Sequence, residues 1–234
     1  MCTRFVLLQE HLREMLKQLG LGEDPGYVSR YNIAPSTPLA AVRSTPQRDR
    51  ATLRWGLVPS WAKEDVGAKM VNARAETLAE KPAFRDALRQ RRCVIPASGY
   101  YEWQTVGTAK LPWLFQLRDE QPFVFAGLWE TWRDGGGAPL ETCAIVTTTP
   151  NELAGPIHNR MPVVLEAAGA AAWLDPGETD PARLTRLLQK LPAEKMTARA
   201  VSRYVSHVRH EGPACLAAPG DEPAADDPQL SLNW

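Results

Sequence analysis

Residues 111–132 read LPWLFQLRDEQPFVFAGLWETW, and this stretch decides which class of fold the chain can adopt. Its two halves, LPWLFQLRD and PFVFAGLWETW, are rich in aromatic and aliphatic residues that favour β-strands. Asp119–Pro122, between them, carries turn-forming residues. We therefore predict two consecutive strands joined by a turn at Asp119–Pro122.

Further strands are predicted on both sides of this pair. They lie in residues 39–42, in RATLRW at 50–55, at 92–95, in ETCAIVTTT at 141–149 and in RMPVVL at 160–165. Helices are predicted over residues 6–19, 84–91, 167–174 and 181–191, and a polar, aromatic loop over Ser98–Trp103. Many short strands and few helices predict an α+β fold with a twisted, partly closed, mainly antiparallel sheet and flanking short helices.

The composition is that of an ordinary globular chain, with 44% hydrophobic and 23% charged residues among 234. This length fits one large domain or two small ones, and there is no internal repeat. We expect no membrane span and no secretion signal. The four cysteines form no CxxC pair, which argues against a zinc knuckle and a disulfide framework and favours a reducing cytoplasm. We expect no metal and no cofactor.

Positive charge gathers in the first part of the chain. Residues 1–100 carry a balance of +6 and residues 101–234 a balance of −6, and 20 of the 27 basic residues are arginine. Arginine binds phosphate through a planar fork, so a basic first half could line a nucleic-acid surface. High-GC codon usage also enriches arginine, and composition leaves both explanations open.

The chain opens MCTRF, which places a cysteine at the second position. If Met1 is removed, Cys2 carries two nucleophiles on adjacent carbons, a free α-amine and a thiol. Taken alone, a cysteine near a start codon more often has no special role. Three other polar residues could serve this amine and thiol: Asn72 in VNARAET, Glu102 in ASGYYEW and His158 in IHNRMPVVL.

Each of these residues has chemistry that fits such a pair. A histidine titrates near neutral pH, and a glutamate in an apolar setting, here supplied by Tyr100, Tyr101 and Trp103, can be tuned into the same range. An asparagine can orient an amine without adding charge. Each also has an ordinary structural explanation: a surface histidine, a carboxylate at a sheet edge, a capping asparagine.

Taken together and in order, the motifs resemble those of the SRAP family, SOS-response-associated peptidase-like proteins that attach covalently to abasic DNA. The resemblance spans nearly the whole chain. Its motifs are MC-x-RF, RYNIAPSTP, RWGLVPSWA, NARAET, RRCVIPASGYYEW, FAGLWE and HNRMPVVL. One departure is Thr3, where the family usually has glycine; this affects the expected rate rather than the identity.

The resemblance implies that Cys2, freed of Met1, forms a Schiff base and then a thiazolidine with the ring-opened aldehyde of an abasic site in single-stranded DNA. It implies that Asn72 holds the amine and thiol, that Glu102 shuttles protons and that His158 assists deoxyribose ring opening. Met1 would be removed by an aminopeptidase or by the protein itself. The residues that match the family's DNA contacts are Arg4, Arg74, Arg85, Arg160, Trp61 and Trp103.

The resemblance also implies an SRAP domain over residues 2–218, followed by an acidic, proline-rich and disordered tail over 219–234. We expect a cytoplasmic monomer, associated with the nucleoid when it is bound to DNA. Two other functions are compatible with the residues. One is an N-terminal-nucleophile hydrolase or peptidase acting through Cys2. The other is a single-stranded DNA-binding module in which Cys2 is incidental.

Overall fold

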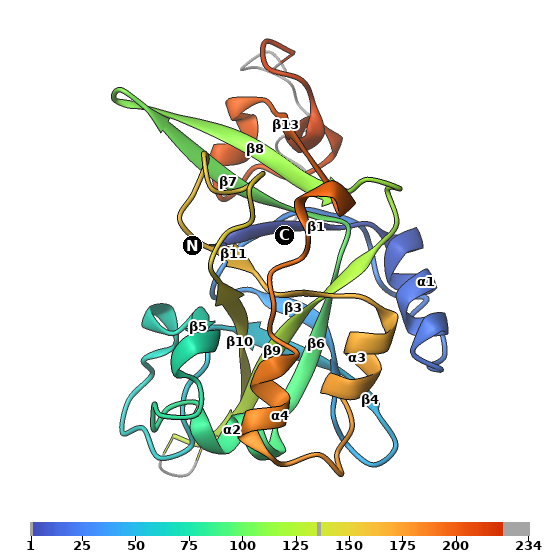
Figure 1. Ribbon diagram of the computed structural model, residues 1–234, viewed down its shortest axis with the longest axis vertical. Helices are drawn as coiled ribbons and strands as arrows, with labels where there is room; N and C mark the ends of the chain where they lie inside the picture. Colours follow the sequence, from blue (N-terminus) through green and yellow to red (C-terminus); the bar gives the residue numbers. More distant parts are fainter. Residues whose placement is uncertain (1, 135–136, 222–234) are drawn as a thin grey trace.

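Five strands close into a ring in the computed structural model, which describes residues 2–134 and 137–221 (Figure 1). The strands are β3 (Pro38–Arg43), β4 (Asp49–Trp55), β6 (Arg92–Ala97), β9 (Phe123–Trp132) and β10 (Leu140–Thr148). They pair in the order β10, β4, β3, β6, β9 and back to β10. The predicted α+β fold with a partly closed sheet is therefore confirmed.

The ring contains one parallel pair among antiparallel ones. Strand β4 runs parallel to β10, with Arg54 opposite Thr142, and the other four pairs are antiparallel. A ring of five strands cannot alternate direction all the way round, so at least one neighbouring pair must be parallel. The mainly antiparallel character that the sequence predicts is thus kept as far as ring closure allows.

A second, antiparallel sheet lies at one end of the ring (Figure 1). Its order is β13 (Met196–Ala200), β8 (Ala109–Leu117), β7 (Gly99–Val106), β1 (Arg4–Leu7) and β2 (Arg30–Ile33). The chain passes directly from β6 to β7 at Ser98, whose amide donates to the Val6 carbonyl at 2.8 Å. The Ser98–Trp103 loop is therefore a wrong prediction, because β1 and β8 pair with this segment on both sides.

The two strands of residues 111–132 form as predicted, but they do not pair with each other. Strand β8 pairs with β7 and β13 in the second sheet, whereas β9 pairs with β6 and β10 in the ring. The turn after β8 therefore connects the two sheets instead of closing a hairpin.

Helices cover the outside of the sheets (Figure 1). They are α1 (Gln9–Gln18), α2 (Arg85–Gln90), α3 (Ala167–Trp173) and α4 (Pro181–Arg186). The predicted helix over residues 6–19 begins too early, because Val6 and Leu7 lie in β1, paired on both sides. The predicted helix over 181–191 ends at Arg186; the Leu191 carbonyl beyond it accepts instead from the Asn151 side chain at 2.8 Å.

Alternation along β1 divides the apolar residues between two clusters. Phe5 points into the ring, where its edge meets Trp55 at 5.5 Å and Phe125 at 5.6 Å between ring centroids. Val6 points to the other face of the second sheet and packs with Tyr101. The start of the chain therefore lies between two buried clusters.

Three short strands extend the ring toward the start of β1. Strand β5 (Asn72–Arg74) runs parallel to β10, β11 (Met161–Pro162) pairs with β10, and β12 (Val164–Leu165) pairs with β9. The expected domain boundary at residue 218 stays a prediction. Of the expected disordered tail, residues 222–234 lie outside the described residues.

Candidate active site

Cys2 lies just before β1, which is flanked by β7 and β2 in the second sheet. Its side chain is fully buried and belongs to the same core cluster as Phe5 and Tyr100. Burial first, and then the negative charge of Glu102, raise the pKa of the Cys2 thiol well above its usual range. The thiol is therefore protonated at neutral pH in this structure.

Asn72 reaches the chain start from the first position of β5. Parallel pairing sets Asn72 opposite Ile145 in β10, and its Nδ2 donates to the Cys2 carbonyl oxygen at 2.8 Å. Its Oδ1 is buried and has no hydrogen-bond partner among the described residues. Asn72 therefore holds the Cys2 backbone here and leaves one buried acceptor; the predicted contact with amine and thiol stays a prediction.

Glu102 lies in β7, the middle strand of the second sheet, opposite Trp113 of β8, and is only 4% exposed. Burial raises the pKa of the Glu102 carboxyl to about 7. At neutral pH this carboxyl is thus present in both its acid and its base form. That is the condition under which one group can both donate and accept a proton during a reaction.

His158 lies beside this carboxyl, with 3.8 Å between its Nδ1 and Glu102 Oε1. The same Nδ1 accepts from the Arg160 amide at 3.0 Å, and burial is the main cause that lowers the pKa of His158. The imidazole is therefore neutral at pH 7. The site thus combines a titrating carboxyl with a neutral imidazole.

The four predicted catalytic residues come from separate parts of the chain and meet at its start. Cys2 contacts Asn72 through a hydrogen bond, Glu102 lies near His158, and the charge of Glu102 acts on the Cys2 thiol. Such a group can present a nucleophile, orient it through an amide and move protons near neutral pH.

Arg4 differs from its predicted place at a DNA surface. It is 7% exposed, and its guanidinium donates to Asn32 Oδ1 at 2.8 Å and to the Val205 carbonyl at 2.9 Å. It also lies over the Trp103 ring, 5.6 Å from the centroid. Since its donors are occupied by the protein, Arg4 ties the segment after β13 to the second sheet in this structure, and a phosphate could reach it only if that segment moved.

The other predicted DNA contacts fall into two groups. Arg74, at the end of β5, and Arg85, at the start of α2, are exposed. Arg160 is half-buried and binds both carboxylate oxygens of Glu76, at 2.7 and 2.9 Å. Its guanidinium is therefore less accessible than the other two.

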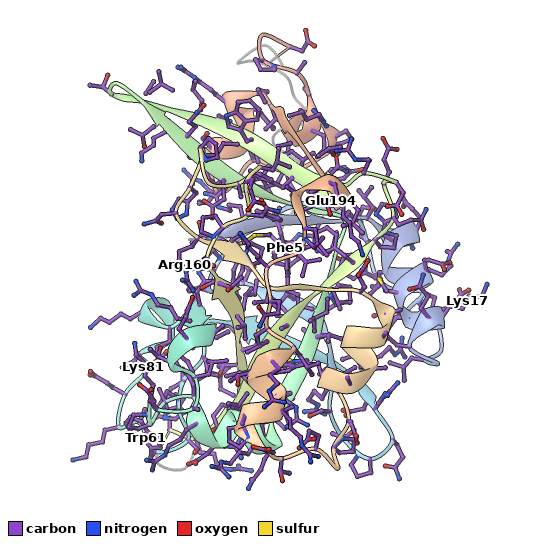
Figure 2. The ribbon with its side chains drawn as sticks, viewed as in Figure 1. Phe5, Lys17, Trp61, Lys81, Arg160 and Glu194 are labelled. Atoms are coloured by element: carbon purple, nitrogen blue, oxygen red, sulfur yellow. The ribbon has the colours of Figure 1, made fainter. Side chains whose placement is uncertain are left out.

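The two predicted base-contacting tryptophans also differ in exposure. The Trp61 side chain is 64% exposed, whereas Trp103 is half-buried and donates from Nε1 to Ser206 Oγ at 3.0 Å. Figure 2 shows Arg160 and Trp61 along one edge of the molecule and Lys17 on the opposite edge. Trp61 is thus the freer aromatic side chain.

Asn32 is a residue of this region that the sequence reasoning missed. It is 3% exposed, and its Nδ2 donates to the carbonyls of Val205, His207 and His210. Its signal in the sequence is a polar residue between the apolar positions of RYNIAP, which form β2. Asn32 and Arg4 together hold the segment whose Val205 packs with Tyr101 in the second apolar cluster.

The described residues contain neither a membrane-spanning helix nor a cluster of metal-binding side chains. No helix there is long and apolar enough to cross a membrane. Within residues 2–134 and 137–221, no three histidine, cysteine or carboxylate side chains gather as a metal site would require.

The sequence is similar to that of known proteins over most of its length. Residues 1–208 match the family described as SOS response associated peptidase (SRAP). The Bacillus subtilis protein named abasic site processing protein YoqW is 42% identical over 222 residues, covering 92% of this chain and 99% of its own. The chicken abasic site processing protein HMCES is 32% identical over 247 residues, covering 89% and 73%.

Solved structures show the same fold. A crystal structure of a Bacteroides thetaiotaomicron protein superposes with a TM-score of 0.84 at 26% identity and covers 93% of this chain and 99% of that one. The match of family and fold confirms the resemblance drawn from the motifs. The chain therefore belongs to the SOS response associated peptidase (SRAP) family.

Proposed function

We propose that this protein captures abasic sites in single-stranded DNA by covalent attachment to Cys2, after Met1 has been removed. The observation that carries the proposal is the convergence of Asn72, Glu102 and His158 on the second residue of the chain. The names of the relatives, abasic site processing proteins, support the same substrate.

The first step is formation of a Schiff base. An abasic deoxyribose is partly open, with an aldehyde at C1′, and His158 assists this opening. The free amine of Cys2 attacks the aldehyde carbon, the carbonyl oxygen leaves as water, and a C=N bond forms. An α-amine has a pKa of roughly 7.7–8.0, so a useful fraction is neutral at cellular pH.

Glu102 serves this step because its carboxyl titrates near neutral pH. Its acid form can protonate the departing oxygen, and its base form can take a proton from the attacking amine. Asn72 contributes its Oδ1, the buried acceptor without a partner among the described residues, which can accept from the Cys2 amine. The hydrogen bond from Nδ2 to the Cys2 carbonyl keeps this acceptor beside the new chain end.

The second step closes a thiazolidine ring. The Cys2 sulfur bonds to the imine carbon, and the thiol proton passes to the ring nitrogen. Ring closure is intramolecular, so the effective concentration of the thiol is very high. A five-membered ring needs the amine and thiol on adjacent carbons, which only an N-terminal cysteine provides.

Single-stranded DNA would be bound by exposed basic and aromatic side chains. Arg74 and Arg85 are placed to contact phosphates, and Trp61 can stack on a base. Arg160 could join them if its ion pair with Glu76 opened. Trp103 lies next to Glu102 in β7 but points to the opposite face of the sheet, so it could contact DNA only if its hydrogen bond to Ser206 opened.

Intact-protein mass spectrometry tests the proposal. The purified chain is mixed with a single-stranded oligonucleotide that bears one abasic site. We expect a heat-resistant species with the mass of the protein without Met1, plus the oligonucleotide, minus one water. An unmodified protein without Met1, beside an intact abasic site, would contradict the proposal.

Variants at Cys2 separate this function from its rivals. Cys2→Ala should abolish the heat-resistant adduct, whereas Cys2→Ser should leave only a reversible Schiff base that borohydride can trap. If Cys2→Ala kept full function with abasic DNA, a plain DNA-binding module would be the better explanation. Repeated release of an acid from a peptide or amide would favour an N-terminal-nucleophile hydrolase.

A further inference from the structure

The hydroxyl of Tyr100 is buried and makes no hydrogen bond to the described residues of the fold. Tyr100 is 0% exposed, and its hydroxyl has no hydrogen-bond partner among the described residues. A buried hydroxyl left unpaired lowers the stability of a folded protein. Most buried polar groups are paired, so an unpaired one requires an explanation.

Packing alone does not explain the hydroxyl. The Tyr100 ring stacks on Phe115 with 4.8 Å between centroids and 5° between planes, and it meets the edge of Phe125 at 6.2 Å. All of these contacts involve only the aromatic ring, so a phenylalanine at this position could make them as well. The neighbouring Tyr101 is different, because its hydroxyl donates to the Tyr31 carbonyl at 2.9 Å.

The position of Tyr100 relates its hydroxyl to the reacting groups. Tyr100 and Glu102 are two residues apart in β7, so their side chains lie on the same face of the sheet. Tyr100 shares a core cluster with Cys2, whereas Tyr101 belongs to the cluster on the opposite face. Burial first, then the nearby Cys2 and Glu102, raise the pKa of Tyr100. The phenol therefore stays protonated and can only be a donor to a nearby anion.

We infer that the Tyr100 hydroxyl donates a hydrogen bond to the Cys2 sulfur while the thiazolidine ring closes. This inference rests on the proposed function and adds a residue to its second step. Cys2 lies ahead of the first paired residue of β1, so its side chain can turn toward the hydroxyl without loss of strand pairing.

The step balances without a further reactant. The thiol gives up its proton, the sulfur gains negative charge, and the Tyr100 O–H stabilises that charge. The sulfur then forms the S–C bond as the C=N bond becomes a single bond, and the nitrogen takes up the proton. Tyr100 keeps its own proton throughout, and there is no oxidation or reduction.

Tyr100→Phe tests the inference, with Tyr101→Phe as the matched control. The protein without Met1 is mixed with an abasic oligonucleotide, and samples are quenched with or without borohydride. In the samples quenched with borohydride, the heat-resistant adduct measures the imine and the closed ring together, because borohydride reduces the imine to a stable amine. In the samples quenched without it, the heat-resistant adduct measures the closed ring alone. In Tyr100→Phe we expect imine formation at the wild-type rate and ring closure slowed about tenfold, as for loss of a hydrogen bond to an anion.

The pH profile separates chemistry from packing. Without the donor, the thiol ionises at higher pH. The pH profile of the rate of ring closure should therefore shift to higher pH in Tyr100→Phe and stay unchanged in Tyr101→Phe. Folding of Tyr100→Phe should be unchanged or stronger, because an unpaired hydroxyl has been removed. Wild-type ring closure and an unmoved profile in Tyr100→Phe would overturn the inference. Absence of any adduct in the wild-type protein would instead overturn the proposed function.

Discussion

At the scale of single residues, Glu102 has the protonation behaviour that the proposed reaction needs. Its carboxyl is 4% exposed, and burial raises its pKa to about 7. Glu102→Gln keeps the shape and removes the proton transfer, so we expect Schiff-base formation to slow about a hundredfold, within the range for general acid–base catalysis. A plot of the rate of Schiff-base formation against pH should change slope near pH 7 for the wild-type protein and should not do so for the variant. Equal rates and profiles would exclude proton transfer by Glu102.

The same carboxyl should make stability depend on pH. The folded protein keeps this proton up to about pH 7, whereas an unfolded glutamate loses it near pH 4.5. The folded state therefore binds more protons across this window, and the contribution of Glu102 to stability falls as pH rises. Urea unfolding at several pH values should show Glu102→Gln gaining stability relative to wild type between pH 4.5 and pH 8. A constant difference would contradict the raised pKa.

At the scale of elements, one buried arginine joins two helices to the ring. Arg92 is 0% exposed and makes no hydrogen bond to a carboxylate among the residues that the structure describes. Its guanidinium donates to carbonyls at the ends of α2 and α3, those of Leu88, Arg89, Trp173 and Asp175. Positive charge is favourable at the carboxyl end of a helix, where carbonyls lack backbone partners.

Arg92→Met should therefore be strongly destabilising. It leaves these carbonyls unpaired inside the protein, and we expect a loss of about 3 kcal/mol or more in the free energy of unfolding. Arg89→Ala, at an exposed site of the same helix, is the control and should change stability by less than about 0.5 kcal/mol. Urea denaturation measures both. Equal effects would show that the buried hydrogen bonds contribute little.

Asn32 has a similar role for the segment that follows β13. Its side chain donates to three carbonyls of residues 205–210 and accepts from Arg4. Asn32→Ala should loosen this segment, so trypsin should cut after the exposed Arg203 or Arg209 about tenfold faster than in wild type. Gln18→Ala on the exposed face of α1 is the control. Unchanged cleavage in Asn32→Ala would mean that other contacts hold the segment.

At the scale of the whole molecule, both parts of the chain supply strands to both sheets, so the basic excess of residues 1–100 is not confined to one sheet. Strands β1 and β2 share one sheet with β7, β8 and β13, and strands β3, β4 and β6 share the ring with β9 and β10. The DNA surface is therefore predicted from exposure, through Arg74 and Trp61. Net charge alone would not identify it.

Two substitutions should change DNA binding in different ways. Arg74→Glu should weaken binding to single-stranded DNA and make the dependence on salt less steep, by about one phosphate contact. Trp61→Ala should lower affinity about tenfold with an unchanged salt dependence, as loss of base stacking would. Lys17→Glu, on the opposite edge of the molecule in Figure 2, is the charge control. Equal loss in Lys17→Glu and Arg74→Glu would indicate that binding has no defined face. Fluorescence anisotropy at several salt concentrations measures all three.

The sequence by itself determined the class of fold and predicted the chemistry. The position of Cys2 as the second residue is read directly from the sequence. The strands of residues 111–132 were predicted from their local composition, and the structure contains them as β8 and β9. The four predicted site residues could also be found from the sequence, because each lies in a short motif of neighbouring residues. Local signals were wrong where two strand partners overrode them, as at Val6 and at Ser98–Trp103.

Only the tertiary structure decided what depends on contacts between distant residues. It decided that five strands close into a ring with one parallel pair, because direction around a ring is a property of all its members. It bound Arg4 to the Val205 carbonyl and left the Tyr100 hydroxyl without a partner among the described residues. It also raised the pKa of Glu102, because burial by other parts of the chain removes water from its carboxyl.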